Sequence, residues 1–152
     1  MMKLEQAIQS AKFETQVQKA GLNVLYTAWW LKTLVSRELK SFGLTHEQYN
    51  VLRILKGKYP ELMCVRDIGN RMIEKNSNVP RIIDRLELKK FAERSTSLVD
   101  KRETVITITE TGIKTLDLVS KKVKPLFEKT IPLTEEDALQ LTQLLEKMRQ
   151  KE

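Results

Sequence analysis

The sequence is poor in cysteine and histidine, and each shortage excludes a kind of site. Its single cysteine, Cys64, excludes an internal disulfide and any metal site made of cysteines alone. Its single histidine, His46, has no neighbouring cluster of Cys, Asp and Glu at ligand spacing, so we expect neither a metal nor a cofactor. There is no glycine-rich phosphate loop, no nucleophile elbow and no carboxylate pair in an apolar setting. We therefore expect no enzymatic activity.

Long apolar runs are scarce as well. The most apolar window runs from Leu22 to Val35, and with Lys32 inside it the window is too short and too polar to span a bilayer. The first residues carry Lys3 and Glu5 where a signal peptide would have its apolar core. We therefore expect a cytoplasmic protein in a reducing compartment.

Acidic residues are the minority among the charges. The 152 residues include 27 Lys and Arg against 20 Asp and Glu, which gives a net charge of +7. Residues 1–105 carry this whole excess, and residues 106–152 are neutral. A basic chain of one-domain length favours a polyanionic partner. Many basic proteins bind nothing anionic, however, so charge alone leaves the partner open.

Residues 4–40 contain no proline and keep helical spacing, which predicts one long helix with Gly21 as its weak point. Two apolar stripes run side by side along its second half: Leu22, Leu25, Tyr26 and Trp29, and Val24, Ala28, Leu31 and Val35. A helix that is apolar around most of its girth must be buried on more than one side. The core of one domain covers one side, and a second subunit is the simplest cover for the other.

Two helices are predicted in the last third of the chain. Thr109 and Glu110 begin the first, and Pro125 should kink or end it. Thr134, which three acidic residues follow, is a strong start signal for the second helix. The apolar residues of that helix form a short seam of the coiled-coil type: Ala138, Leu141, Leu145 and Met148.

The middle of the chain predicts a winged helix. Thr45 and Gln48 form a capping box that begins a helix, and residues 57–60 end it. An extended piece, a two-turn helix, a second helix and a charged hairpin follow: residues 62–65, 66–73, 77–90, and 93–96 with 104–109. A helix-turn-helix followed by a hairpin is the element order of a winged helix.

The predicted helix at residues 77–90 has two chemically different faces. At about 100° per residue, its apolar side chains share about one third of the circumference: Val79, Ile82, Ile83 and Leu86. The opposite side is polar, with Asp84 at its margin: Ser77, Asn78, Arg81 and Arg85. Arg suits the two acceptors of guanine and Asn the donor and acceptor of adenine, although either arginine suits a phosphate equally well. If the helix is considered alone, such a face is most simply a solvated surface. The hairpin that follows it favours a face that binds duplex DNA instead. With Ser77 as the N-cap, Pro80 would lie in the first turn, where no amide donor is required.

Three motifs, in this order, resemble the MarR family of winged-helix transcription regulators. They are Thr45-x-x-Gln48-Tyr49-x-Val51-Leu52, Ser77-x-Val79-x-Arg81-x-x-Asp84-Arg85-Leu86, and Asp100-x-Arg102 ahead of Val105, Thr109 and Gly112. The flanking helices also fit, so the resemblance extends across nearly the whole chain. The family usually has glycine in two turns where this chain has Ile73 and Lys90, and a second arginine where it has Lys101.

The resemblance implies a mainly α-helical fold with a small β-hairpin, in which a winged helix-turn-helix is flanked by N- and C-terminal dimerisation helices. We expect residues 43–111 to bind DNA, and residues 1–42 and 112–152 to form the dimerisation region. The helix at residues 77–90 would enter the major groove, and the hairpin would lie along the minor groove. Asp100 would orient Arg102, which inserts into the minor groove, with Lys101 beside it.

Regulators of this family take small aromatic effectors between their terminal helices and the winged domain. That makes four aromatic residues candidates for a ligand pocket: Tyr26, Trp29, Trp30 and Tyr49. Packing in the core is the alternative for the same residues. Cys64 lies in an apolar run, so we expect a buried, inert thiol rather than a redox sensor.

We therefore expect a homodimeric regulator of transcription that reads a pseudo-palindromic operator in double-stranded DNA. We expect this regulator to repress transcription, and a small aromatic ligand is the candidate effector that would release it from DNA. The rival hypothesis is a winged-helix module that docks onto another protein without specific DNA binding.

Overall fold

The computed structural model describes residues 2–10, 12–75 and 77–150. The elements run in the order α1 Leu4–Ala7, α2 Gln16–Lys40, α3 His46–Lys58, β1 Met63–Cys64, α4 Val65–Arg71, α5 Val79–Leu88, β2 Ala92–Thr96, β3 Thr104–Ile108, α6 Glu110–Thr130 and α7 Glu135–Met148. The three strands pair antiparallel in the order β1-β3-β2. The predicted fold class, mainly helical with a small hairpin in a winged helix-turn-helix, is confirmed.

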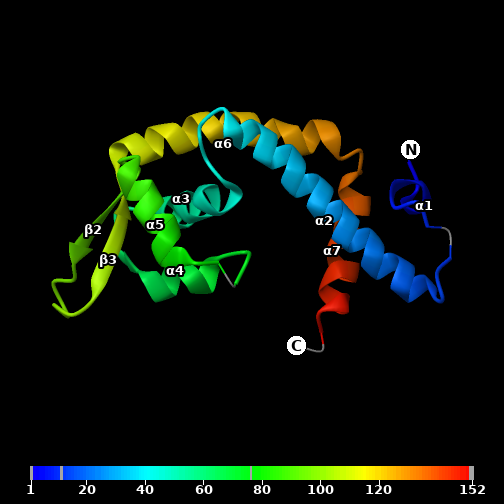
Figure 1. Cartoon of the computed structure of the whole chain (residues 1–152), viewed down its shortest axis with the longest axis horizontal. Coiled ribbons are helices and arrows are strands. Elements are labelled where there is room, and N and C mark those ends of the chain that lie inside the picture. Colours follow the sequence, from blue (N-terminus) through cyan, green and yellow to red (C-terminus); the bar gives the residue numbers. More distant parts are fainter. Residues whose placement is uncertain (1, 11, 76, 151–152) are drawn as a thin grey trace.

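The core lies where α3, α4, α5 and the sheet meet. Its fully buried side chains come from each of these elements: Leu52, Leu55, Ile68, Ile83, Leu86 and Ile106. The C-terminal end of α2 and the first half of α6 add Leu39 and Val119 to the same core. Figure 1 shows this winged unit at one end of the molecule, with the rest of α2, the end of α6, and α7 extending away from it. Within the described ranges, no helix has the length and apolar character needed to cross a membrane.

At three of the predicted helix starts, a threonine side chain caps the helix. The Oγ1 atom of Thr45 accepts from the N–H of Gln48 at 3.2 Å, which completes the capping box of α3. Thr109 accepts from Gly112 at 3.0 Å to begin α6, and Thr134 caps α7 in the same way. These caps satisfy amide groups that have no partner inside the helix, so they fix where each helix starts.

The first helix is shorter than predicted, and the continuous helix over residues 4–40 is wrong. The chain leaves helical geometry after Ala7, passes through a positive φ of 52° at Gln9, and resumes at Gln16. Thr15 caps α2 by accepting from the N–H of Gln18 at 3.1 Å. The absence of proline hid this break, although the Thr15 and Gln18 pair has the same spacing as the recognised capping box at Thr45.

Pro125 does not end α6, which continues to Thr130. A proline inside a helix removes one hydrogen bond and crowds the preceding turn. Here tertiary packing holds the helix on both sides of it, because Val123 is buried and Leu126 packs against the core. Burial on the flanking turns therefore outweighs the local cost of proline.

The N-cap of α5 is Asn78 rather than Ser77. The Oδ1 atom of Asn78 accepts from the N–H of Arg81 at 3.2 Å. The amide of Ser77 instead donates to the carbonyl of Glu74 at 3.1 Å, in the turn before the helix. Pro80 still lies in the first turn, as predicted, where its missing N–H leaves no carbonyl without a partner.

Lys90 ends α5 in a conformation that suits glycine. Its φ is +59°, its N–H donates to the carbonyl of Glu87, and the N–H of Phe91 donates to the carbonyl of Leu86. This hydrogen-bond pair is a Schellman motif with lysine at the left-handed position. A left-handed backbone costs an L-residue about 1–2 kcal/mol, so the turn carries strain that a glycine would not.

We expect Lys90→Gly to raise the free energy of unfolding by about 0.5–1 kcal/mol, because relief of the strain exceeds the entropy that glycine adds to the unfolded chain. Urea unfolding at a fixed protein concentration measures the change. Lys90→Ala removes the same charge and keeps the strain, so it serves as the matched control. A gain as large in Lys90→Ala would assign the effect to charge instead.

Candidate nucleic-acid interface

Helix α5 buries one side and exposes the other. Val79, Ile83 and Leu86 are buried against the core, and Arg81 and Arg85 are exposed on the outer side. The structure thus separates apolar and basic residues along the faces that the sequence predicts. The Oγ atom of Ser77 is buried, so this predicted contact residue does not present its hydroxyl on the outer side.

Asn78 is exposed at the start of α5, but part of its side chain is already in use. Its Oδ1 atom is the cap acceptor for Arg81, which leaves the Nδ2 donors for a ligand. A paired donor and acceptor contact with adenine would have to share Oδ1 with the helix cap. The cap role was missed because Ser77 also has a capping side chain and precedes Asn78 directly.

The hairpin of β2 and β3 forms a wing with an ordered tip. The buried Ser97 Oγ accepts from the N–H groups of Val99 and Asp100 at 3.2 Å each. The main chain of Ser97 donates to Glu103 O at 2.9 Å, which closes the loop. The tip therefore presents Lys101 and Arg102 from a hydrogen-bonded turn, and both side chains are exposed.

The side chain of Asp100 contacts the backbone of Arg102. The Oδ1 atom of Asp100 accepts from the N–H of Arg102 at 2.9 Å, which is an Asx-type turn. In the part of the chain that the structure describes, no ion pair joins this carboxylate to the guanidinium of Arg102. Asp100 thus orients the backbone that carries Arg102, and it leaves the guanidinium to face solvent.

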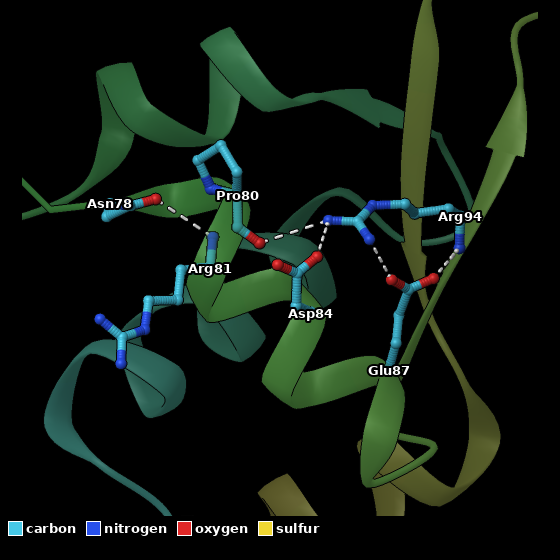
Figure 2. Close-up of polar contacts among 6 residues, drawn as sticks. All are labelled: Asn78, Pro80, Arg81, Asp84, Glu87 and Arg94. Atoms are coloured by element: carbon cyan, nitrogen blue, oxygen red, sulfur yellow. Dashed lines mark hydrogen bonds and ion pairs between the residues drawn. The ribbon is translucent and has the colours of Figure 1, made fainter.

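Arg94 on β2 joins the wing to α5 (Figure 2), a contact that was not predicted. Its Nη2 atom lies 2.6 Å from Asp84 Oδ1, and its Nη1 atom lies 2.5 Å from Glu87 Oε2. The Nη2 group also donates to the carbonyl of Pro80 at 3.3 Å. Both carboxylates of α5 are therefore paired, and Arg81 and Arg85 remain as its outward charges.

Lys89 holds the end of α5 against α3. Its Nζ atom donates to Gln48 Oε1 at 2.9 Å and to the carbonyl of Gly43. Burial, followed by the charge of nearby Arg85, lowers the pKa of Lys89 from its ordinary value. These contacts fix the axis of α5 relative to the first helix of the winged unit.

The four aromatic pocket candidates are not gathered in one cavity. The rings of Tyr26 and Trp29 lie 5.5 Å apart on α2, where Trp29 is 59% exposed. Trp29 borders an open depression of about 380 Å³ along α2, beside Lys32, Arg37 and Lys40. Tyr49 belongs to the core instead, with the guanidinium of Arg53 5.9 Å from its ring centre. Trp30 is half-buried on α2.

Cys64 is buried, and its Sγ atom accepts from the N–H of Asp67 at 3.4 Å at the start of α4. This position fits a structural thiol. Among residues 2–10, 12–75 and 77–150, no three His, Cys, Asp or Glu side chains lie where they would hold a metal ion. The exposed guanidinium groups of α5 and of the wing tip are those of Arg81, Arg85 and Arg102.

Comparison with known proteins places this geometry among regulators. A model of the MarR family matches residues 44–104, from the start of α3 through the wing. The HTH-type transcriptional regulator MhqR of Bacillus subtilis is 27% identical over 117 residues, which cover 75% of this chain and 78% of that protein.

Solved structures share the fold over most of the chain. AbsC, a MarR family transcriptional regulator from Streptomyces coelicolor, superposes with a TM-score of 0.79 at 22% identity and covers 93% of this chain and 97% of its own. MepR of S. aureus, solved as a complex with DNA, superposes with a TM-score of 0.77 at 23% identity and covers 93% and 100%. The agreement includes the terminal helices as well as the winged unit.

Proposed function

We propose that this chain, which belongs to the MarR family, is a dimeric regulator of transcription that binds double-stranded DNA in a sequence-specific manner. The observation that carries the proposal is the joint display of exposed guanidiniums on α5 and at the wing tip. Helix α5 can lie in a major groove, and Arg102, on an ordered turn, can insert into a narrow minor groove. MepR, which shares the fold, was solved in a complex with DNA.

The contact residues follow from this arrangement. Arg81 and Arg85 would contact base edges or phosphates in the major groove, and Asn78 would contribute its Nδ2 donors there. Lys101 and Arg102 would contact the minor groove and its flanking phosphates. Phosphate contacts fix the register of a protein on the duplex, and base-edge contacts give the sequence preference.

Exposed apolar side chains support a second copy of the chain as partner. Leu25 and Trp29 of α2 are 68% and 59% exposed, and Leu144 of α7 is 61% exposed. We assign residues 1–42 and 112–152 to dimerisation and residues 43–111 to DNA binding. Two copies related by a two-fold axis would read a pseudo-palindrome with half-sites about one helical turn apart.

The cellular role follows as part of the same proposal. We infer a cytoplasmic repressor, with a small aromatic molecule near Tyr26, Trp29 and Trp30 as the candidate effector. Tyr49 is the weakest member of that set, because it is already packed in the core. The rival function is a winged helix that docks onto another protein and has no specific affinity for DNA.

A binding titration at several salt concentrations tests the proposal. Duplexes selected from the region upstream of the gene, or from a random library, would be titrated with the wild-type protein, Arg81→Ala and Arg102→Ala. We expect each substitution to weaken binding by about 1–3 kcal/mol. The plot of log affinity against log salt should be less steep by about one unit where the lost arginine contacts a phosphate.

Lys122→Ala is the matched control, because Lys122 is an exposed cation on α6 outside α5 and the wing. It should leave affinity and salt slope unchanged. Equal binding by wild type, Arg81→Ala and Arg102→Ala at moderate salt would show that the assigned surface is wrong. Affinity in the millimolar range for every duplex at low salt would favour the protein-docking rival.

A further inference from the structure

Arg94, on a strand of the wing, contacts residues from the first turn of α5 to near its end. Its guanidinium meets the carbonyl of Pro80 in the first turn, Asp84 in the middle, and Glu87 near the end. The backbone N–H of Arg94 also donates to Glu87 Oε1 at 3.1 Å, so both oxygens of that carboxylate are used. Figure 2 shows the guanidinium between the helix and the strand, with its nitrogen atoms directed at the helix.

This contact specifies an orientation more than it adds stability. A guanidinium is planar and presents its donors in a fixed fork, so several acceptors at once hold it in one geometry. The Arg94 side chain is 31% exposed, and the carboxylates of Asp84 and Glu87 are 56% and 29% exposed. Ion pairs that are this accessible contribute little to folding. The angle between α5 and the wing is what the network determines.

The same network sets the charge of the candidate interface. Asp84 and Glu87 would repel a phosphate backbone if they were unpaired, since α5 carries only Arg81 and Arg85 as cations. Arg94 compensates both carboxylates with nitrogen atoms that are directed at the helix. Its substitution would therefore change the charge of α5 and release the wing at the same time, and an experiment must separate the two effects.

We propose that Arg94 is a positioning residue that couples the wing to α5, so that the contribution of Arg102 to DNA binding depends on Arg94. The inference rests on the proposed DNA-binding function and deepens it. With Arg94 in place, docking of α5 in the major groove carries the wing tip to the minor groove in a single orientation. Without it, the wing tip samples other orientations, and Arg102 loses most of its contribution.

A double-mutant cycle on duplex DNA tests this coupling. Arg94→Met keeps the apolar stem and removes the guanidinium, and we expect it to weaken binding by about tenfold. We call the factor by which Arg102→Ala reduces affinity the Arg102→Ala penalty. In the Arg94→Met background this factor should be smaller by about fivefold or more than in the wild-type background. Lys122→Met in place of Arg94→Met should be additive with Arg102→Ala, because Lys122 has no contact with the network.

Two further variants separate orientation from charge. Arg94→Lys keeps the positive charge and loses the fork, so it should leave the Arg102→Ala penalty as small as Arg94→Met does. Asp84→Asn with Glu87→Gln in the Arg94→Met background removes the repulsion, and the small Arg102→Ala penalty should persist there too. Full recovery of that penalty by either variant would overturn the positioning role and leave only charge compensation.

Failure of the coupling and failure of the proposed function give different results. If the wild-type protein binds duplex DNA and the two penalties add, the coupling is overturned while DNA binding stands. If the wild-type protein binds no duplex even at low salt, both are overturned. Amide order parameters of Lys101 and Arg102 in free Arg94→Lys should also fall below the wild-type values, since the wing is then held less firmly. Unchanged order parameters would count against the coupling, and circular dichroism would verify that each variant is folded.

Discussion

Gly112→Ala should lower the free energy of unfolding by about 3 kcal/mol or more, which is among the largest effects expected of a single methyl group. A β-carbon at this position would lie 2.1 Å from the carbonyl oxygen of Phe91 and 2.8 Å from Cγ1 of Ile108. The first distance is far inside van der Waals contact and involves backbone, which cannot rotate away as a side chain does.

The surroundings of Gly112 leave little room for adjustment. The N–H of Thr109 donates to the same Phe91 carbonyl at 3.1 Å, and the Oγ1 atom of Thr109 caps α6 through the N–H of Gly112. Moving α6 outward together with Thr109 would break the bond to Phe91, and moving it without Thr109 would break the cap. Phe91 in turn follows the left-handed Lys90 and is held by its bond to the carbonyl of Leu86. The new methyl group therefore strains the junction of α5, the sheet and α6.

Gly57→Ala is the matched control, since Gly57 is a helical glycine with nothing within 4 Å of an added β-carbon. It should raise the free energy of unfolding by up to about 1 kcal/mol, the difference in helix propensity between alanine and glycine. Urea unfolding followed by tryptophan fluorescence, at one protein concentration, measures both variants. A Gly112→Ala protein as stable as wild type would show that the junction yields more easily than its hydrogen bonds indicate.

The second large effect is expected at α7. No residue of α7 is buried within one chain, and Leu141 and Leu144 are 45% and 61% exposed. We expect Leu141→Glu with Leu144→Glu to convert the dimer to a monomer at micromolar concentration, because each buried leucine contributes about 1.5–3 kcal/mol and a buried carboxylate opposes association. Affinity for an operator with two half-sites should fall by about 10²–10⁴-fold, since the second half-site no longer binds intramolecularly.

Sedimentation equilibrium gives the mass, and the same titration used for the arginine variants gives the affinity. Gln140→Glu with Gln143→Glu adds the same charge to exposed polar positions of α7 and should leave both measurements unchanged. Binding to an isolated half-site should be similar in the leucine variant and in wild type. An intact dimer in the leucine variant would remove α7 from the proposed interface.

The parts of the fold that were predictable have local causes. Thr45, Thr109 and Thr134 begin helices because each side chain reaches an amide three residues further on, and that spacing is visible in the sequence. The apolar and basic faces of α5 follow from helical periodicity alone. The hairpin follows from two short segments of polar and β-branched residues on either side of a charged tip.

The parts that were missed depend on contacts between elements. Arg94 is an ordinary polar strand residue until α5 packs beside it and places Asp84 and Glu87 within reach. Pro125 predicts a kink or an end on local grounds, and the packing of Val123 and Leu126 on either side of it explains why α6 continues. Asn78 and Ser77 are equivalent caps by residue type, and the turn that ties Ser77 to Glu74 decides between them.

The exposed side chains of α7 have a consequence for how this protein folds. A helix of this length gains little stability from its own hydrogen bonds, and within one chain none of the apolar residues of α7 is fully buried. We therefore expect its ordering to depend on a second chain, while the winged unit has a core of its own. The temperature at which α7 melts should rise as protein is added, by mass action, and on dilution α7 should fray before the winged unit unfolds.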